Sequence, residues 1–183
     1  MDRKLCDMSL EELWRLFPIE LVKHRPVWRQ WAAEEIDCLE RLLGDIRVTI
    51  THIGSTAIPG IMAKPIVDIL VLIPPDGDMV SLRCRLESQG YICMNESPAR
   101  MSFNKGYTSE GYAERVFHIH CHRYGDDSEI KFRDYLRSHG EAAREYESLK
   151  KSLLPEYKYD RDGYTAAKSV FVDRILRLAK SEI

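Results

Sequence analysis

Apolar side chains recur at helical spacing in the first part of the chain. Ser9 and Glu12 have the spacing of a capping box, so a short helix is predicted to begin there. A longer helix is predicted from Pro26 to Gly44, because proline suits the first helical turn and glycine suits the end of a helix.

The middle of the chain has the hydrophobic pattern of strands. Residues 46–51 alternate between apolar and polar, and residues 66–73 form an apolar run interrupted only by Asp68. Shorter candidate strands are residues 91–94, 101–105 and 115–122. Asp78 is placed to cap an intervening helix that Gly90 ends.

After Gly125 the pattern becomes helical again. One apolar stripe consists of Ala142, Tyr146, Leu149 and Leu153, and Pro155 is expected to end that helix. A second stripe consists of Tyr164, Ala167, Phe171, Ile175 and Leu178. The mixed charges of residues 144–151 are typical of a solvated helix face. We therefore expect an α/β (α+β) fold in one domain, residues 1–183, with a mixed sheet flanked by helices and a helical part from about residue 126.

Composition narrows the possible partners and location. With 183 residues and a net charge of −2, the chain has no evident general surface for nucleic acid and no electrostatic attraction to a membrane. Its longest apolar run is too short to span a bilayer. Its five cysteines are odd in number and form no CxxC pair, which favours free thiols and a cytoplasmic location.

The segment His52–Gly60, HIGSTAIPG, places a Gly-Ser turn after a candidate strand. Gly54 permits a tight turn and close approach of a ligand to the backbone. Ser55 and Thr56 offer hydroxyls and N–H groups where a helix begins, a favourable position for a phosphate. The same residues would also make an ordinary turn and helix cap.

Asp68 lies inside an apolar strand, where an unpaired carboxylate is unfavourable by several kcal/mol. A cation, a basic partner or hydrogen-bond donors would compensate for that cost. Its alternative role is a structural pair near the end of the strand.

Three histidines alternate with apolar residues in the last candidate strand. His118, His120 and His122 share one face, and neighbours on that face lie about 6.5–7 Å apart. Two of them can converge on one ion, so His118 and His120 are candidate metal ligands, to be completed by a carboxylate or another histidine. The alternative is three histidines on a solvated face.

These segments together resemble a known family. The stretch HIGSTAIPGIMAKPIVDILV, from His52 to Val71, resembles the signature of the GrpB family, and FRDYLR, from Phe132, resembles its second signature together with the preceding His-x-His. The resemblance extends from about Leu21 to the last helix. It implies a nucleotidyltransferase-like fold of the DNA polymerase beta superfamily, in which a Gly-Ser turn precedes a strand that carries an acidic pair. In that comparison Gly54 and Ser55 match the turn, and Asp68 matches the first, catalytic acid.

Leu70 stands where the resemblance places the second acid. Two-metal nucleotidyl transfer uses clustered carboxylates to hold magnesium. Either His118 and His120 replace the missing ligands, or catalysis has been lost. The expected cofactor is thus a divalent metal, zinc, manganese or magnesium, held by Asp68, His118 and His120.

Basic side chains are needed wherever a nucleotide binds. The candidates are Lys64, Arg115, Lys131, Arg133 and Lys168. The resemblance favours Lys168, because superfamily enzymes often use a lysine from the carboxy-terminal helices, and Lys168 follows Tyr164 by one helical turn. An ordinary surface lysine is the alternative.

Two functions remain open. The first is metal-assisted transfer of a nucleotidyl group from a nucleotide to an unknown acceptor. The second is a catalytically degenerate domain that binds a nucleotide or a protein, in a chaperone-like role. Metal-dependent hydrolysis is a weaker third hypothesis, because the sequence offers no nucleophile or base for it beyond the same residues. Any function in which Asp68 and His120 share a metal requires these two residues to lie on neighbouring strands, with their side chains on a common face.

Overall fold

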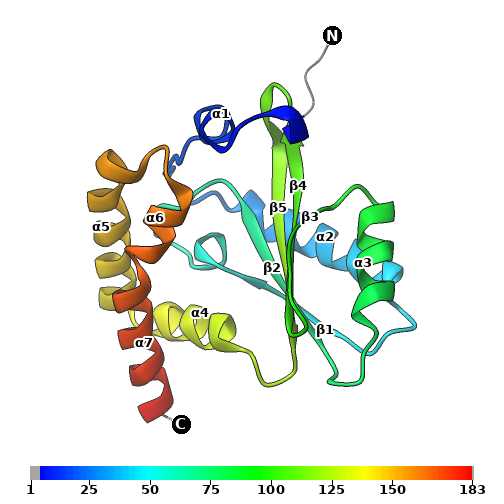
Figure 1. Ribbon diagram of the computed structural model, residues 1–183. Coiled ribbons are helices and arrows are strands. Elements are labelled where there is room, and N and C mark those ends of the chain that lie inside the picture. The colour runs from blue at the N-terminus through cyan, green and yellow to red at the C-terminus, as the bar shows by residue number, and fades with distance from the viewer. Residues whose placement is uncertain (1–4, 183) are drawn as a thin grey trace.

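A five-stranded mixed sheet runs through the computed structural model of the protein, which describes residues 5–182 (Figure 1). Residues 1–4 and 183 of the expected domain lie outside the described residues. The strands are β1 (Thr49–Ile53), β2 (Val67–Ile73), β3 (Ile92–Glu96), β4 (Arg100–Thr108) and β5 (Gly111–Arg123). Their order in the sheet is β1-β2-β5-β4-β3. The neighbours β2 and β5 are parallel, whereas the other pairs are antiparallel.

The helices lie on both sides of this sheet. They are α1 (Leu10–Leu16), α2 (Val27–Leu42), α3 (Met79–Ser88), α4 (Ser128–Ser138), α5 (Gly140–Tyr157), α6 (Arg161–Ala166) and α7 (Ser169–Ser181), with short 3-10 turns η1 (Leu5–Asp7) and η2 (Ser55–Ala57). Figure 1 shows α2 and α3 on one side of the sheet and α4 to α7 on the other. The expected capping box at Ser9 and the expected cap at Asp78 are both present.

Alternation along β2 separates the main core from the other face. Val67, Ile69, Val71 and Ile73 are fully buried and pack with aromatic and aliphatic side chains of α2 and α3. The intervening positions, beginning with Asp68, point to the opposite face, as the period of two requires. Any chemistry at Asp68 therefore takes place on the side of α4 to α7.

The strands differ from their predicted limits at two places. β1 begins at Thr49 rather than at residue 46 and continues to Ile53. The strands β4 and β5 are longer than predicted and form one hairpin, whose turn lies between Thr108 and Gly111. Gly106 has a φ of 91°, and a Cβ there would lie 2.2 Å from the Arg115 carbonyl oxygen, so this glycine sits in a bulge rather than ending the strand.

The carboxy-terminal helices also differ from expectation. Pro155 does not end its helix, because it lies in the last turn of α5, which continues to Tyr157. The stripe predicted from Tyr164 to Leu178 is divided between α6 and α7, with the break at Ala167 and Lys168. In the described part of the chain, no helix is long and apolar enough to cross a membrane.

Candidate functional site

The parallel pairing of β2 and β5 brings one carboxylate to two imidazoles. Asp68 is in register with His118, and the next position on the same face of β5 is His120. Asp68 Oδ1 lies 3.4 Å from His118 Nδ1 and 3.3 Å from His120 Nε2. Asp68 and His120 thus lie on neighbouring strands with their side chains on a common face, as predicted. We call Asp68, His118 and His120 the metal-ligand cluster.

The spacing of these atoms suits a small tetrahedral cation. Their ligand atoms all lie within 4.8 Å of one another. Bonds of about 2.0–2.1 Å in a tetrahedral zinc site separate two ligand atoms by about 3.3 Å. The two distances to Asp68 Oδ1 match that separation, and two imidazoles with one carboxylate are a donor set that suits zinc. The residues present therefore fit a divalent metal and leave a fourth position for a ligand.

The three groups set each other's protonation. Burial alone would raise the pKa of Asp68, but hydrogen bonds from His118 and His120 hold it well below its usual range. Burial lowers the pKa of His118 more than Asp68 raises it, so this imidazole is neutral near pH 7. At His120 the attraction of Asp68 outweighs burial, and the pKa is raised. An ionised carboxylate beside a neutral imidazole is the state that binds a cation.

A second layer of contacts orients His118. Tyr107 Oη lies 2.7 Å from His118 Nε2, and Arg161 donates a hydrogen bond of 2.9 Å to the same hydroxyl. Such outer contacts fix the ring and its tautomer, and they leave Nδ1 directed at Asp68. Neither Tyr107 nor Arg161 was singled out in the sequence, because a single tyrosine in a strand and a single arginine near a turn carry no pattern.

Leu70 occupies the position of the absent second acid and is fully buried. It packs with Ile53, Leu72 and Ile130. This face of β2 therefore offers one carboxylate and then an apolar contact. Farther along β5, His122 lies 3.4 Å from an Asp126 carboxylate oxygen, so the third histidine belongs to a separate group.

Gly54 brings the turn directly against Asp68. Its φ of 72° and ψ of −174° lie in a region essentially confined to glycine. A Cβ at this position would lie 2.4 Å from Asp68 Oδ2. The glycine is therefore required both for the conformation of the turn and for the close approach of the carboxylate.

Lys150 corrects the prediction that residues 144–151 form a solvated face. Lys150 is 3% exposed and lies on the buried face of α5 with Ala143 and Tyr146. Its Nζ donates a hydrogen bond of 3.2 Å to Ser55 Oγ and another to the Met62 carbonyl. The spacing Ala143, Tyr146, Lys150 is helical and was the available signal. The side chain joins α5 to the Gly-Ser turn.

Lys64 and Lys168 lie near Lys150. Lys168 Nζ is 4.4 Å and Lys64 Nζ is 5.8 Å from the centroid of the Tyr164 ring. None of these three lysines has a carboxylate within ion-pair distance among the residues that the structure describes. We call Lys64, Lys150 and Lys168 the basic cluster. Lys168 faces Tyr164 as expected, although Lys168 lies in the break between α6 and α7.

Burial and mutual repulsion make the basic cluster electrostatically unfavourable without an anion. Burial, and then the charges of Lys168 and Lys64, lower the pKa of Lys150 to about 7 against the attraction of Glu147. Burial and the charge of Lys64 lower the pKa of Lys168 to about 8. The pKa of Lys64 is lowered by burial and by Arg161. A bound polyanion would relieve this repulsion.

Other predicted phosphate ligands have different partners. Thr56 is buried, and its hydroxyl lies 2.9 Å from His52 Nε2. Arg115 pairs with Glu34, and Lys131 pairs with Asp127. The structure therefore does not direct these three side chains at a phosphate beside Ser55.

Arg133 has a structural role instead of the predicted contact with phosphate. It is buried and donates hydrogen bonds to Thr51 Oγ1 and the His52 carbonyl of β1. On the same helix Arg137 donates to the Ala57 carbonyl of η2. The FRDYLR segment thus fixes β1 and the Gly-Ser turn to α4.

A cavity of about 250 Å³ lies between the Gly-Ser turn, the metal-ligand cluster and the helical layer, and the lysines of the basic cluster are not among its lining residues. It is lined by Gly54, Ser55, Asp68, His120 and Tyr146, together with side chains of α4 and α7. The turn, one side of the metal-ligand cluster and the helical layer therefore face the same space. Its walls offer the carboxylates of Asp68 and Glu129, the His120 imidazole and the hydroxyls of Ser55 and Ser128.

This fold is nucleotidyltransferase-like. A mutant of the Cid1 poly(U) polymerase bound to MgATP superposes with a TM-score of 0.50 at 14% identity, covering 78% of this chain and 47% of that chain. The crystal structure of the conserved protein GrpB from Enterococcus faecalis superposes with a TM-score of 0.75 at 27% identity, covering 89% of this chain and 98% of that chain.

The chain belongs to the GrpB protein family, whose pattern matches residues 18–178. A UPF0157 protein of Pseudomonas aeruginosa is 40% identical over 161 residues, which are 86% of this chain. The chain spans 66% of the length of that relative. The resemblance in the two signatures is thus confirmed at the level of family and fold.

Proposed function

We propose that this protein binds a nucleotide by its phosphates together with a divalent metal and transfers the nucleotidyl group to an acceptor. The observation that carries the proposal is the position of the Gly54-Ser55 turn between two clusters. Asp68 of the metal-ligand cluster lies against Gly54, and Lys150 of the basic cluster bonds Ser55. A metal site and a polyanion site separated by one turn suit a metal–triphosphate ligand.

Each cluster has a separate task in this proposal. Asp68, His118 and His120 would hold the metal, which when bound supplies Lewis-acid polarisation of a phosphoryl oxygen. Ser55 and Lys150 bind phosphate oxygens directly. Lys64 and Lys168 neutralise the charge of the phosphates, including the charge that develops on departing pyrophosphate. Zinc or manganese suits the two imidazoles better than magnesium does.

The fold supports the same ligand class. The Cid1 poly(U) polymerase is a nucleotidyltransferase-like neighbour whose structure contains MgATP. That structure is a precedent for a nucleotide in this architecture, and the basic cluster supplies the charge that such a ligand requires here.

A second candidate is nucleotide binding without chemistry. The specific observation in its favour is Leu70, which is fully buried and packed where a second acid would stand. With one carboxylate on this face of β2, the metal-ligand cluster holds one metal, whereas two-metal transfer clamps both the attacking and the leaving oxygen. Both candidates require nucleotide binding, and they differ in turnover.

The test combines binding with turnover. Binding of a non-hydrolysable ATP analogue is measured by calorimetry with zinc, manganese or magnesium, and pyrophosphate release from ATP is measured with the small-molecule fraction of a cell extract as the source of acceptor. The variants are Asp68→Asn and Lys150→Met, with Lys151→Met as a matched control, because Lys151 is an exposed lysine paired with Glu147.

If the protein transfers a nucleotidyl group, binding of the ATP analogue should be lost in Lys150→Met and kept in Lys151→Met. The wild-type protein should release pyrophosphate, and Asp68→Asn should not. Binding with the same dependence on residues but no pyrophosphate release supports the second candidate and contradicts transfer. Absence of binding with every metal contradicts both.

A further inference from the structure

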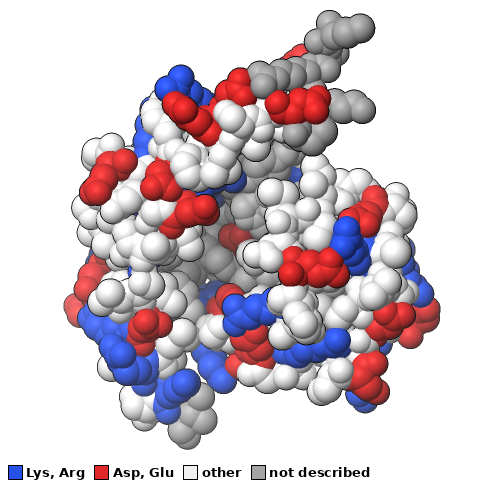
Figure 2. Space-filling view, in the orientation of Figure 1, with Lys and Arg blue, Asp and Glu red and all other residues white. Residues whose placement is uncertain are grey.

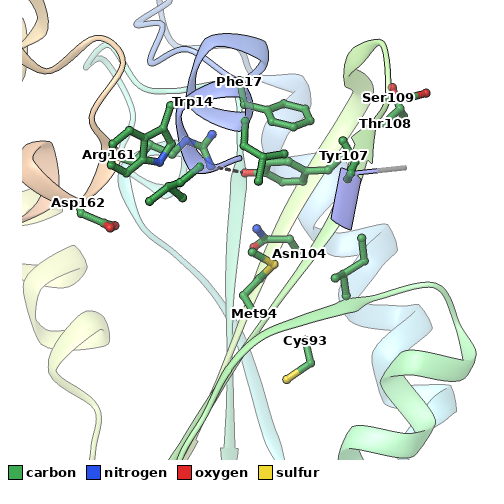
Figure 3. A pocket seen from close by; sticks show the side chains of 14 residues that line it. Trp14, Phe17, Cys93, Met94, Asn104, Tyr107, Thr108, Ser109, Arg161 and Asp162 are labelled. Atoms are coloured by element: carbon green, nitrogen blue, oxygen red, sulfur yellow. Dashed lines mark hydrogen bonds between the residues drawn. The ribbon is translucent and has the colours of Figure 1, made fainter. Parts of the chain in front are cut away.

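A second and larger cavity lies beside the metal-ligand cluster. Its volume is about 840 Å³, and it is enclosed by α1, the strands β3 and β4, and the start of α6 (Figure 3). Figure 2 shows this face of the molecule hollowed between the carboxy-terminal helices and the sheet. A volume in the range of about 300–1,000 Å³ is typical of pockets for small organic ligands.

Most of the lining is apolar. Trp14 and Phe17 approach from the amino-terminal segment, while Ile92 and Met94 project from β3. Ile92 is 46% exposed and Met94 is 58% exposed, so these two large apolar side chains of one strand leave much of their surface open to the cavity. A ligand with an apolar body would remove this surface from water.

One cation reaches the wall of this apolar space. Arg161 donates hydrogen bonds to the hydroxyls of Tyr107 and Tyr112, and its guanidinium lies 5.4 Å from the centroid of the Tyr107 ring. Its Nε is buried and has no hydrogen-bond partner. Among the described residues, no carboxylate lies within ion-pair distance of Arg161.

The other charged residue of the lining does not satisfy Arg161. Asp162 is exposed, and Figure 3 shows its carboxylate at the edge of the cavity while the guanidinium points toward Tyr107. Arginine favours carboxylate and phosphate groups because its N–H donors match two oxygens at once. A partly buried guanidinium that has no carboxylate partner and lines an apolar space is complementary to an anion with an apolar body.

We propose that this cavity binds a small amphipathic anion, a molecule with an alkyl or aromatic body and one carboxylate or phosphate group that pairs with Arg161. The apolar body lies against Trp14, Ile92 and Met94. Because Arg161 and His118 share the Tyr107 hydroxyl, the anionic group lies on the β4 side of the metal-ligand cluster. This site goes beyond the proposed function and does not depend on nucleotide binding.

The experiment uses the full chain and the fluorescent probe 1-anilinonaphthalene-8-sulfonate, an aromatic body with one anionic group. Displacement of the probe is measured with octanoate, octyl phosphate and octanol, which share one alkyl chain. Octanoate or octyl phosphate should bind at least about tenfold more tightly than octanol, since a charge-assisted hydrogen bond distinguishes them. The better of the two anions identifies the anionic group.

Arg161→Gln should abolish this preference, whereas Arg177→Gln, which changes an exposed arginine of α7 outside the cavity lining, should retain it. Met94→Asp places a negative charge on an exposed wall position and should weaken both anions even if Arg161→Gln unfolds. Equal displacement by octanol and the anions, no displacement at all, or an unchanged preference in a folded Arg161→Gln variant would overturn the proposal. Asp68→Asn should retain octanoate binding, so failure of nucleotide binding is a distinguishable result.

Discussion

At the scale of single residues, the Asp68 carboxylate connects the two halves of the site. One oxygen contacts His118 and His120, and the other lies against Gly54. Each imidazole nitrogen lies at the distance from Asp68 Oδ1 that is expected for two ligands of one tetrahedral ion. Asp68 is therefore the residue whose position depends on both the sheet and the turn.

His118→Ala should abolish tight zinc binding, because it removes one of three donors. The loss of affinity should exceed the roughly 10–100-fold cost of losing an outer-shell partner. Competition with a chromogenic chelator measures the affinity, and His122→Ala serves as the control with a smaller effect, since His122 lies in the separate group with Asp126. Full zinc affinity in His118→Ala would show that this histidine is structural.

Lys150 and Lys168 should make polyphosphate binding depend on pH. Their pKa values of about 7 and 8 mean that both are protonated below pH 7 and lose their charge as the pH rises. A bound anion raises both pKa values, so binding takes up protons between about pH 7 and 9. The affinity should fall by up to about tenfold per pH unit for each lysine that takes up a proton.

Calorimetry of tripolyphosphate at about pH 6–9, which extends one unit either side of these pKa values, measures this effect in buffers of different ionisation enthalpy. Glu147, Lys64 and Lys168 also face Lys150 and are the same in both variants, whereas Lys151 has only a minor effect on the pKa of Lys150. Lys150→Met should reduce the proton uptake, while Lys151→Met should not. A pH-independent affinity in the wild-type protein contradicts an anion site at the basic cluster.

At the scale of elements, the conformation of the Gly-Ser turn determines the position of Asp68 in the metal-ligand cluster. β1 ends directly before Gly54, and α4 holds the turn in place through hydrogen bonds from Arg133 and Arg137 to backbone carbonyls. The backbone angles of Gly54 then leave just enough space for Asp68. A change in the turn therefore reaches the site without altering any ligand.

Gly54→Ala should damage both stability and zinc binding. The strained backbone should lower the free energy of unfolding by about 1–3 kcal/mol, and the new Cβ should displace Asp68. Gly60→Ala is a matched control, because Gly60 also has a positive φ, of 82°, but open space around its Cβ position. Thermal unfolding should detect strain in both variants, whereas a zinc titration should detect a loss only in Gly54→Ala. Equal zinc affinities in the two variants would contradict the contact with Asp68.

At the scale of the whole molecule, local patterns predicted the sheet side of the site and missed its helical side. The period of two along β5 and the apolar run of β2 were sufficient to place Asp68 and His120 on one face. Lys150 meets Ser55 across 95 residues, and Arg161 meets Tyr107 across 54, so no short window of sequence contains either contact. Charge alone was misleading, because Lys150 is buried by the packing of α5 against the turn, while Arg115 and Lys131 pair with half-buried acidic side chains away from the turn.

The central claim is that one metal and one polyphosphate meet at the Gly54-Ser55 turn. Anomalous diffraction from crystals grown with zinc and a non-hydrolysable ATP analogue tests it most directly. We expect a zinc peak within bonding distance of Asp68 Oδ1, His118 Nδ1 and His120 Nε2, with phosphate oxygens beside Ser55 and Lys150. A nucleotide bound with zinc elsewhere, or a metal-ligand cluster without a zinc peak in those crystals, would contradict the account.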